Sequence, residues 1–77
     1  MPHVIVKMFA GRSEDEKQVL SAEITKALMS AIGSAEKSIS VAIEDVTPQD
    51  WLEKVYMPEI AGKPELIYKK PGYDPFA

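Results

Sequence analysis

The first strand-like pattern in the chain runs from His3 to Phe9, where hydrophobic side chains fill most of both alternating sets of positions. Val4, Val6 and Met8 fall on one face of such a strand, and the other face mixes hydrophobic with polar side chains. The pattern predicts a strand that is buried on most of both faces.

A helical periodicity follows this strand. Ser13 and Glu16 have the spacing of a capping box, in which each side chain accepts a hydrogen bond from a free backbone N–H of the first turn. Hydrophobic residues then recur at spacings of three and four: Leu20, Ile24, Ala27, Leu28, Ala31 and Ile32. Gly33 supplies the usual stop, so the spacing predicts one long amphipathic helix.

A second alternation, SISVAIEDV, covers residues 38–46 and predicts another strand. Strand, long helix and strand in this order form a βαβ unit, whose strands run parallel with a right-handed crossover. The expected fold class is therefore α+β, a two-layer sandwich in which a long helix joins short parallel strands.

The last third of the chain carries weaker patterns. Thr47 and Pro48 are typical of an N-cap and the first position of a second helix, which Pro58 makes irregular or ends early. Residues 65–69 fit a short strand or an extended arm, and residues 70–73 fit a turn before a loose end.

One helix covers only one face of a two-stranded sheet, and parallel sheets are normally covered on both. A monomer would leave Ile5, Phe9 and Ala42 in water. We therefore expect a homo-oligomer; the long C-terminal arm favours a dimer and leaves a hexamer open.

Length and composition restrict the function. The 77 residues fit a single domain, residues 1–77. With 9 basic against 12 acidic residues and a net charge of -3, nucleic-acid binding is not expected. The chain has no cysteine, no apolar run long enough for a bilayer and no secretory leader, so we expect a cytoplasmic protein without a membrane partner.

The sequence contains none of the common catalytic motifs, and its lone histidine, His3, is a poor basis for a metal site, so no cofactor or metal is expected. Pro2 is more informative. If Met1 is removed, Pro2 becomes a secondary amine at the start of a buried strand. Burial and a nearby cation such as Arg12 would lower its pKa and leave it neutral, as a general base must be.

Pro2 opening a strand, Gly11-Arg12-Ser13 before a long helix, and Ser38-Ile39-Ser40-Val41 followed by Trp51 together resemble the 4-oxalocrotonate tautomerase family. The opening MPH and the C-terminal segment LIYKKPGY, residues 66–73, are most similar to its dimeric phenylpyruvate enol tautomerase branch. The resemblance covers nearly the whole chain and implies a tautomerase-like sandwich completed by oligomerisation.

The resemblance also implies roles for single residues. Pro2 matches the amino-terminal proline that shuttles a proton between the enol oxygen and carbon. Arg12 matches the arginine that holds a substrate carboxylate, and Trp51 matches a pocket aromatic. The chain departs from the family at Ser40, where 4-oxalocrotonate tautomerase has a second arginine. A single cationic group favours a monocarboxylate such as enolised phenylpyruvate, so the implied enzyme is a cofactor-independent keto-enol tautomerase.

Two alternatives remain open at this point. A hydratase or hydrolytic dehalogenase of unsaturated acids would need a water-activating carboxylate, for which Glu44, Asp50 and Glu53 are candidates. A non-catalytic oligomeric binding protein would keep the fold and leave the nitrogen of Pro2 blocked. Arg12, Ser40 and Trp51 also have ordinary structural interpretations, as a solvated loop residue, a strand residue and a core anchor.

Overall fold

The computed structural model describes all 77 residues, and these form two compact units, residues 1–46 and 47–77. The first unit contains two strands and the long helix, and the second contains short helical elements and an irregular arm. The single domain expected for residues 1–77 stays a prediction. No helix in the chain is both long enough and apolar enough to cross a membrane.

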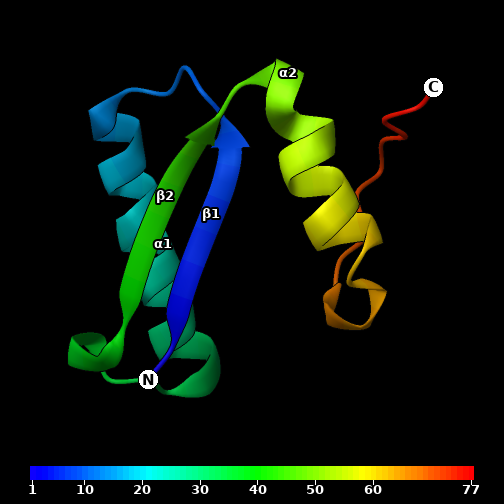
Figure 1. Ribbon diagram of the computed structural model, residues 1–77. Helices are drawn as coiled ribbons and strands as arrows, with labels where there is room; N and C mark the ends of the chain where they lie inside the picture. The colour runs from blue at the N-terminus through cyan, green and yellow to red at the C-terminus, as the bar shows by residue number, and fades with distance from the viewer. The chain divides into compact units, whose positions relative to one another are not determined.

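The N-terminal unit is the predicted βαβ unit. Strands β1 (His3–Phe9) and β2 (Ser40–Val46) pair in parallel, in a register that runs from His3 opposite Ser40 to Phe9 opposite Val46. Helix α1 (Glu14–Ile32) connects them and packs on one face of the pair, as Figure 1 shows. The α+β fold class and the two-layer arrangement are confirmed.

Both ends of α1 form as the sequence predicts. The Ser13 hydroxyl accepts a hydrogen bond from the Glu16 N–H at 3.1 Å, and a Glu16 carboxylate oxygen accepts one from the Ser13 N–H at 2.9 Å. At the other end Gly33 adopts a φ of 68°, and its N–H bonds the Met29 carbonyl at 3.1 Å. This left-handed conformation is readily available to glycine and stops the helix.

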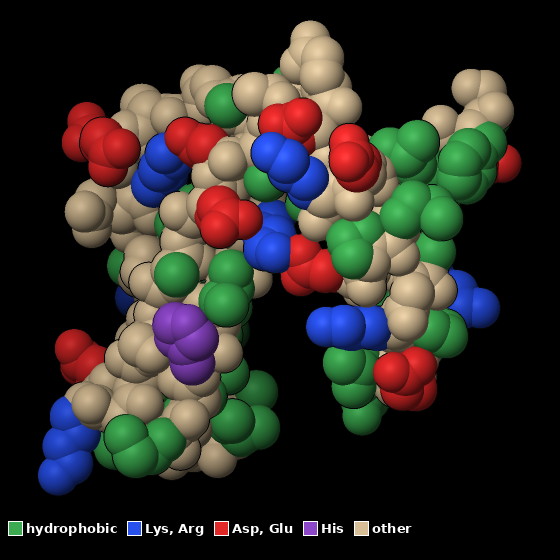
Figure 2. All heavy atoms as spheres, viewed as in Figure 1, with side chains coloured by type: hydrophobic (Ala, Val, Ile, Leu, Met, Phe, Trp, Pro, Cys, Tyr) green, Lys and Arg blue, Asp and Glu red, His purple; other side chains and the backbone are tan.

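The two faces of the sheet differ in exposure. On the helix side, Val4, Val6 and Ile43 are half-buried. On the open side, Ile5 is 56% exposed and Phe9 51% exposed, and Ala42 is also exposed. The side chains predicted to meet water in a lone chain are therefore exposed. Figure 2 shows hydrophobic side chains, in green, beside charged ones on the face turned toward the viewer.

The second strand begins two residues later than predicted. Ser38 ends a short 3₁₀ helix, η1 (Glu36–Ser38), in place of opening β2. Its hydroxyl and its N–H both donate to the Ala35 carbonyl, at 2.8 and 3.0 Å. Serine side chains compete in this way for local backbone groups. This local bonding explains why the alternating pattern starts at residue 38, whereas β2 itself starts at Ser40.

In the C-terminal unit, helix α2 (Pro48–Trp51) continues directly into η2 (Leu52–Ala61), which has π-type hydrogen bonding. Pro58 lies inside η2, so its predicted irregularity is confirmed and an early end is wrong. A proline has no N–H and crowds the carbonyl four residues back, and the wider π turn accommodates that loss. Thr47 occupies the predicted N-cap position, but its side chain makes no capping hydrogen bond.

Residues 65–69 form no strand. They lie in the 3₁₀ helix η3 (Pro64–Leu66) and in the irregular arm that follows it. Aromatic rings hold this arm: Tyr56 lies 6.0 Å from Tyr73 and 6.1 Å from Phe76, between ring centroids. Ring contacts at these distances and tilted or edge-on angles are favourable, so the arm packs through side chains and not through a backbone ladder.

Candidate active site

Pro2 stands immediately before β1 and is half-buried. Its carbonyl accepts a hydrogen bond from the Ser40 N–H at 3.2 Å, which continues the ladder between the strands by one step. Met1, before it, is fully exposed. The backbone at Pro2 is thus fixed by β2, while the residue attached to its nitrogen stands in solvent.

Ser40 is held against the same end of β1 through its side chain as well. Its hydroxyl lies 2.6 Å from Nδ1 of His3, its cross-strand partner, and the two groups share one hydrogen bond. Both residues are exposed on the open face. The structure therefore places the predicted residues Pro2 and Ser40 together, and it adds His3, which the sequence offered only as a poor metal ligand.

Arg12 follows the far end of β1. Its Nη1 donates to a Glu16 carboxylate oxygen at 3.2 Å, and its side chain remains 65% exposed. The Ser13 backbone N–H, and next the Arg12 hydrogen bond, hold the pKa of Glu16 below its ordinary value. Arg12 and Glu16 line a cavity of about 200 Å³ with Met8 and Leu20. A guanidinium has five N–H donors, so Arg12 keeps donors for a second carboxylate.

Pro2 and Arg12 lie at opposite ends of β1 within one chain. The strand has 7 residues, and at about 3.3 Å per residue its ends are roughly 20 Å apart. The carboxylate and the reacting carbon of a 2-oxo acid are only a few bonds apart. One chain therefore cannot apply both groups to a single small substrate.

Trp51 closes α2, in the C-terminal unit, and is half-buried. Its indole Nε1 donates to the Tyr73 hydroxyl at 3.0 Å. The indole of Trp51 is thus anchored to the arm. Sequence reasoning did not single out Tyr73, which it placed only at the end of the turn of residues 70–73.

The carboxylates considered for water activation belong to different units of the chain. Glu44 lies on the open face of the sheet, 3.9 Å from the Lys7 ammonium, and is roughly 13 Å along β2 from Ser40. Asp50 and Glu53 belong to the C-terminal unit, where Asp50 pairs with Lys54 at 3.3 Å. No cluster of histidine, aspartate and glutamate side chains is arranged to hold a metal ion.

A sequence model of the family described as "Tautomerase enzyme" matches residues 2–61, beginning at Pro2. A "Probable tautomerase" from Xylella fastidiosa is 43% identical over 77 residues, covering 100% of this chain and 94% of the relative. "Tautomerase PptA" from Cronobacter sakazakii is 37% identical over 75 residues, covering 96% of this chain and 99% of that protein.

Solved structures agree with the sequence comparisons. YwhB, a homologue of 4-oxalocrotonate tautomerase, superposes with a TM-score of 0.58 at 37% identity, over 60% of this chain and 75% of its own. A 4-oxalocrotonate tautomerase isozyme from Methylibium petroleiphilum gives 0.63 at 30% identity, over 65% and 81%. The chain therefore belongs to the tautomerase family of 4-oxalocrotonate tautomerase homologues and is an enzyme of the isomerase class.

Proposed function

We propose that this tautomerase interconverts keto and enol forms of 2-oxo monocarboxylic acids such as phenylpyruvate, without a cofactor, and that Pro2 is its general acid and base. The observation that carries the proposal is the state of Pro2: half-buried, fixed by the Ser40 N–H, and preceded by a fully exposed Met1. An exposed methionine before a small residue is accessible to an aminopeptidase, and its removal turns an amide nitrogen into an amine.

The proton balance needs only this amine. The neutral nitrogen of Pro2 accepts the enol O–H proton while the C–O bond becomes a carbonyl. The resulting ammonium then donates a proton to the carbon that was part of the enol double bond. The amine is regenerated, and the substrate has moved one proton from oxygen to carbon.

Arg12 supplies the carboxylate anchor, and the length of β1 requires that it come from another copy of the chain. A two-fold axis perpendicular to the strands reverses their direction. It thereby brings the Pro2 end of one strand beside the Arg12 end of the other. The exposed Ile5, Phe9 and Ala42 support such an assembly, because association removes this apolar surface from water. We propose a homodimer in which Pro2 acts with Arg12 of the partner subunit.

Ser40 and Trp51 set the substrate class in this proposal. Ser40 offers one hydroxyl, shared with His3, and no positive charge, so a second carboxylate on the substrate would be poorly bound. Trp51 provides an aromatic surface for the apolar body of the substrate, and its indole is fixed by Tyr73. Both features favour an aryl or alkyl monocarboxylate over a dicarboxylate.

The direct test combines intact mass with turnover. Protein lacking Met1 should convert the enol of phenylpyruvate to its keto form, and protein that retains Met1 should not, because an amide nitrogen cannot accept the proton. If both forms turn over at the same rate, Pro2 is not the acid and base.

A second test addresses the shared site. The Pro2→Ala and Arg12→Ala variants are each expected to be weakly active alone. After subunit exchange, half of the dimers are mixed, and each mixed dimer has one intact site of two, so about a quarter of the wild-type activity should return. No recovery in a mixture shown by mass to contain mixed dimers would place both residues in one chain's site.

A further inference from the structure

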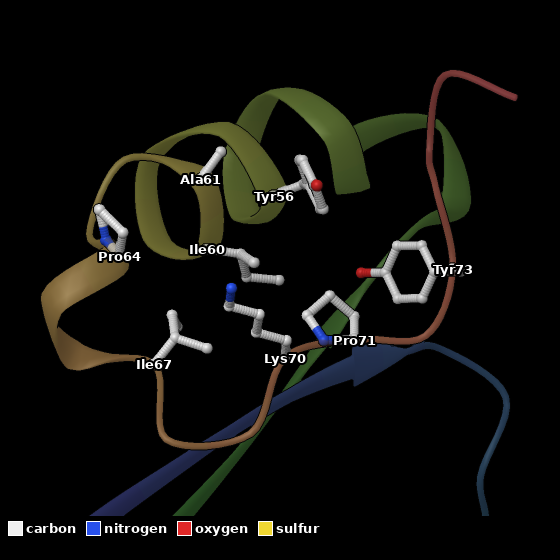
Figure 3. A pocket seen from close by; sticks show the side chains of 8 residues that line it. All are labelled: Tyr56, Ile60, Ala61, Pro64, Ile67, Lys70, Pro71 and Tyr73. Atoms are coloured by element: carbon white, nitrogen blue, oxygen red, sulfur yellow. The ribbon is translucent and has the colours of Figure 1, made fainter.

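A cavity of about 220 Å³ lies within the C-terminal unit, between η2 and the arm that folds back on it. Figure 3 shows the side chains that line it. They are Tyr56, Ile60, Ala61, Pro64, Ile67, Lys70, Pro71 and Tyr73. Most of these residues are aliphatic or aromatic, so the walls suit an apolar molecule.

Lys70 is the one charged residue in this lining. In Figure 3 its ammonium group points into the space that the labelled side chains surround. No carboxylate lines the cavity. Lys70 takes part in none of the ion pairs described for the chain. The positive charge at the cavity is therefore uncompensated, which favours an anionic ligand.

Tyr73 provides a second polar group in the same space. Its hydroxyl accepts the indole N–H of Trp51 at 3.0 Å, which leaves its own proton for donation to another acceptor. Figure 3 shows this hydroxyl directed toward the middle of the cavity, as is the Lys70 ammonium. The Lys70 ammonium and the Tyr73 hydroxyl both point into a space with apolar walls and no carboxylate in its lining, which matches a carboxylate on an apolar body.

The volume limits the size of the ligand. An apolar cavity of about 150 Å³ is sufficient for benzene, and drug-sized ligands occupy roughly 300 Å³ or more. The 220 Å³ available here corresponds to one aromatic ring or branched aliphatic group with a short acidic arm. The family match ends at residue 61, so Pro64, Ile67, Lys70, Pro71 and Tyr73 lie beyond it.

We propose that the cavity of the C-terminal unit is a binding site for a small aromatic or branched monocarboxylate, with Lys70 and Tyr73 as the groups that hold the carboxylate. The site does not depend on tautomerase activity, because all of its groups belong to residues 56–73. Part of its wall belongs to the arm, so an occupied site stabilises the arm against η2.

The test is a titration of the full-length protein with 3-phenylpropionate, which has a ring and a short acidic arm but no keto or enol group. Trp51 is the single tryptophan, so its indole N–H resonance and its fluorescence report on Tyr73 without ambiguity. Saturable binding that shifts this resonance is expected. The neutral isostere 3-phenylpropanamide should bind about tenfold more weakly.

Matched variants assign the binding. Lys70→Gln should weaken it about tenfold, while Lys69→Gln, an exposed lysine outside the lining, should leave it unchanged. Ala61→Phe, which fills the cavity without changing its charge, should abolish binding. Binding of 3-phenylpropionate should persist in Arg12→Ala, because Arg12 does not line this cavity. This outcome does not depend on whether Pro2 is the general acid and base.

Three results would overturn the proposal. The first is no saturable binding to the wild type. The second is equal affinity in Lys70→Gln and wild type. The third is loss of binding in Arg12→Ala with retention in Lys70→Gln, which would place the probe at Arg12. Circular dichroism of each variant shows whether it is folded, and the conservative Lys70→Arg, which keeps the charge, should retain binding.

Discussion

The two compact units of this protein are built in different ways. Residues 1–46 form a strand ladder and a capped α-helix, held by regular backbone hydrogen bonds. Residues 47–77 contain a π-type helix, a 3₁₀ turn and an irregular arm, held by aromatic contacts and the bond from Trp51 to Tyr73. The family match covers the whole of the first unit after Met1 but ends at residue 61 in the second.

The difference suggests a division of labour. Proton transfer needs groups held at fixed positions. Pro2 and Ser40 are joined by a backbone hydrogen bond at one end of the strand pair, and Arg12 directly precedes the capped start of α1. Recognition of an apolar body needs only a wall of suitable shape, which side chains of an irregular arm can provide. We therefore expect the first unit to determine the chemistry and the charge of the accepted substrate, and the second unit to select for its apolar body.

The largest expected effect is that of replacing Pro2 in the first unit. In Pro2→Ala the terminal nitrogen loses the pyrrolidine ring that fixes its direction relative to the substrate, so kcat/KM should fall at least about a hundredfold. Pro48→Ala, at an exposed proline in the first turn of α2, is the matched control and should stay near wild type. Steady-state turnover of enolised phenylpyruvate measures both variants. An equal loss of kcat/KM in both would refute the role of Pro2 as the acid and base.

Arg12→Ala comes next. Loss of a charge-assisted hydrogen bond to the substrate carboxylate should lower kcat/KM by about ten- to a hundredfold, mainly through KM. Lys26→Ala removes an equally exposed cation, paired with Glu23 on α1, and should have no effect. An uncharged enol serves as the second substrate. If Arg12→Ala slows that substrate as much as the acid, Arg12 does not bind the carboxylate.

Ser40→Arg should change preference more than rate. A second cation at the Pro2 end should raise kcat/KM for a dicarboxylate enol relative to a monocarboxylate by about tenfold. Ser40→Ala is the control, because it loses the same bond to His3 without adding charge. A change of the same size in both variants would show that the lost hydroxyl, and not the new charge, is responsible.

The same contrast explains what could be predicted from sequence. The bounds of β1 and the capping box of α1 follow from local patterns, in which Ser13, Glu16 and Gly33 each act on backbone within a few residues. The exposure of Ile5 and Phe9 could be predicted because the sequence provides only one long helix, which covers only one of the two faces of the sheet. These parts of the fold are encoded over short distances along the chain.

The C-terminal unit depends on contacts that no periodicity marks. The π-type path through Pro58 and the return of the arm require Tyr56 to meet Tyr73 and Phe76, which are 17 and 20 residues later in the chain. The cavity and the inward direction of Lys70 exist only once those rings have met. The roles of Pro2 and Arg12 rest on the family resemblance and stay predictions, and their separation follows from the length of β1.

Tyr73→Phe tests how the second unit is held. Removing the hydroxyl takes away the acceptor of the Trp51 indole N–H and should lower the free energy of unfolding by about 0.5–1.5 kcal/mol. Tyr68→Phe removes a hydroxyl from a side chain that is 99% exposed, so it should leave stability unchanged. Urea unfolding followed by Trp51 fluorescence measures both. If the two variants are equally stable, the bond to Tyr73 does not hold the arm.

The smallest effect belongs to the first unit and concerns pH. The Ser13 backbone N–H, and next the Arg12 side chain, lower the pKa of Glu16 in the folded chain from its ordinary value of 4.5. The unfolded chain therefore takes up this proton at a higher pH than the folded chain does. The stabilisation is fully present above pH 4.5 and is lost as pH falls through the lowered folded pKa.

Glu16→Gln separates this titration from the hydrogen bonds. Glutamine satisfies the capping box as glutamate does but carries no titrating proton, so the variant should lose less stability than wild type on acidification below pH 4.5. Glu23→Gln, on the exposed side of α1 and outside the capping box, should behave as wild type. Thermal unfolding at several pH values gives the comparison. Parallel curves for all three proteins would show that the cap of α1 is held without the charge of Glu16, and the backbone ladder would then account for more of the rigidity of the first unit.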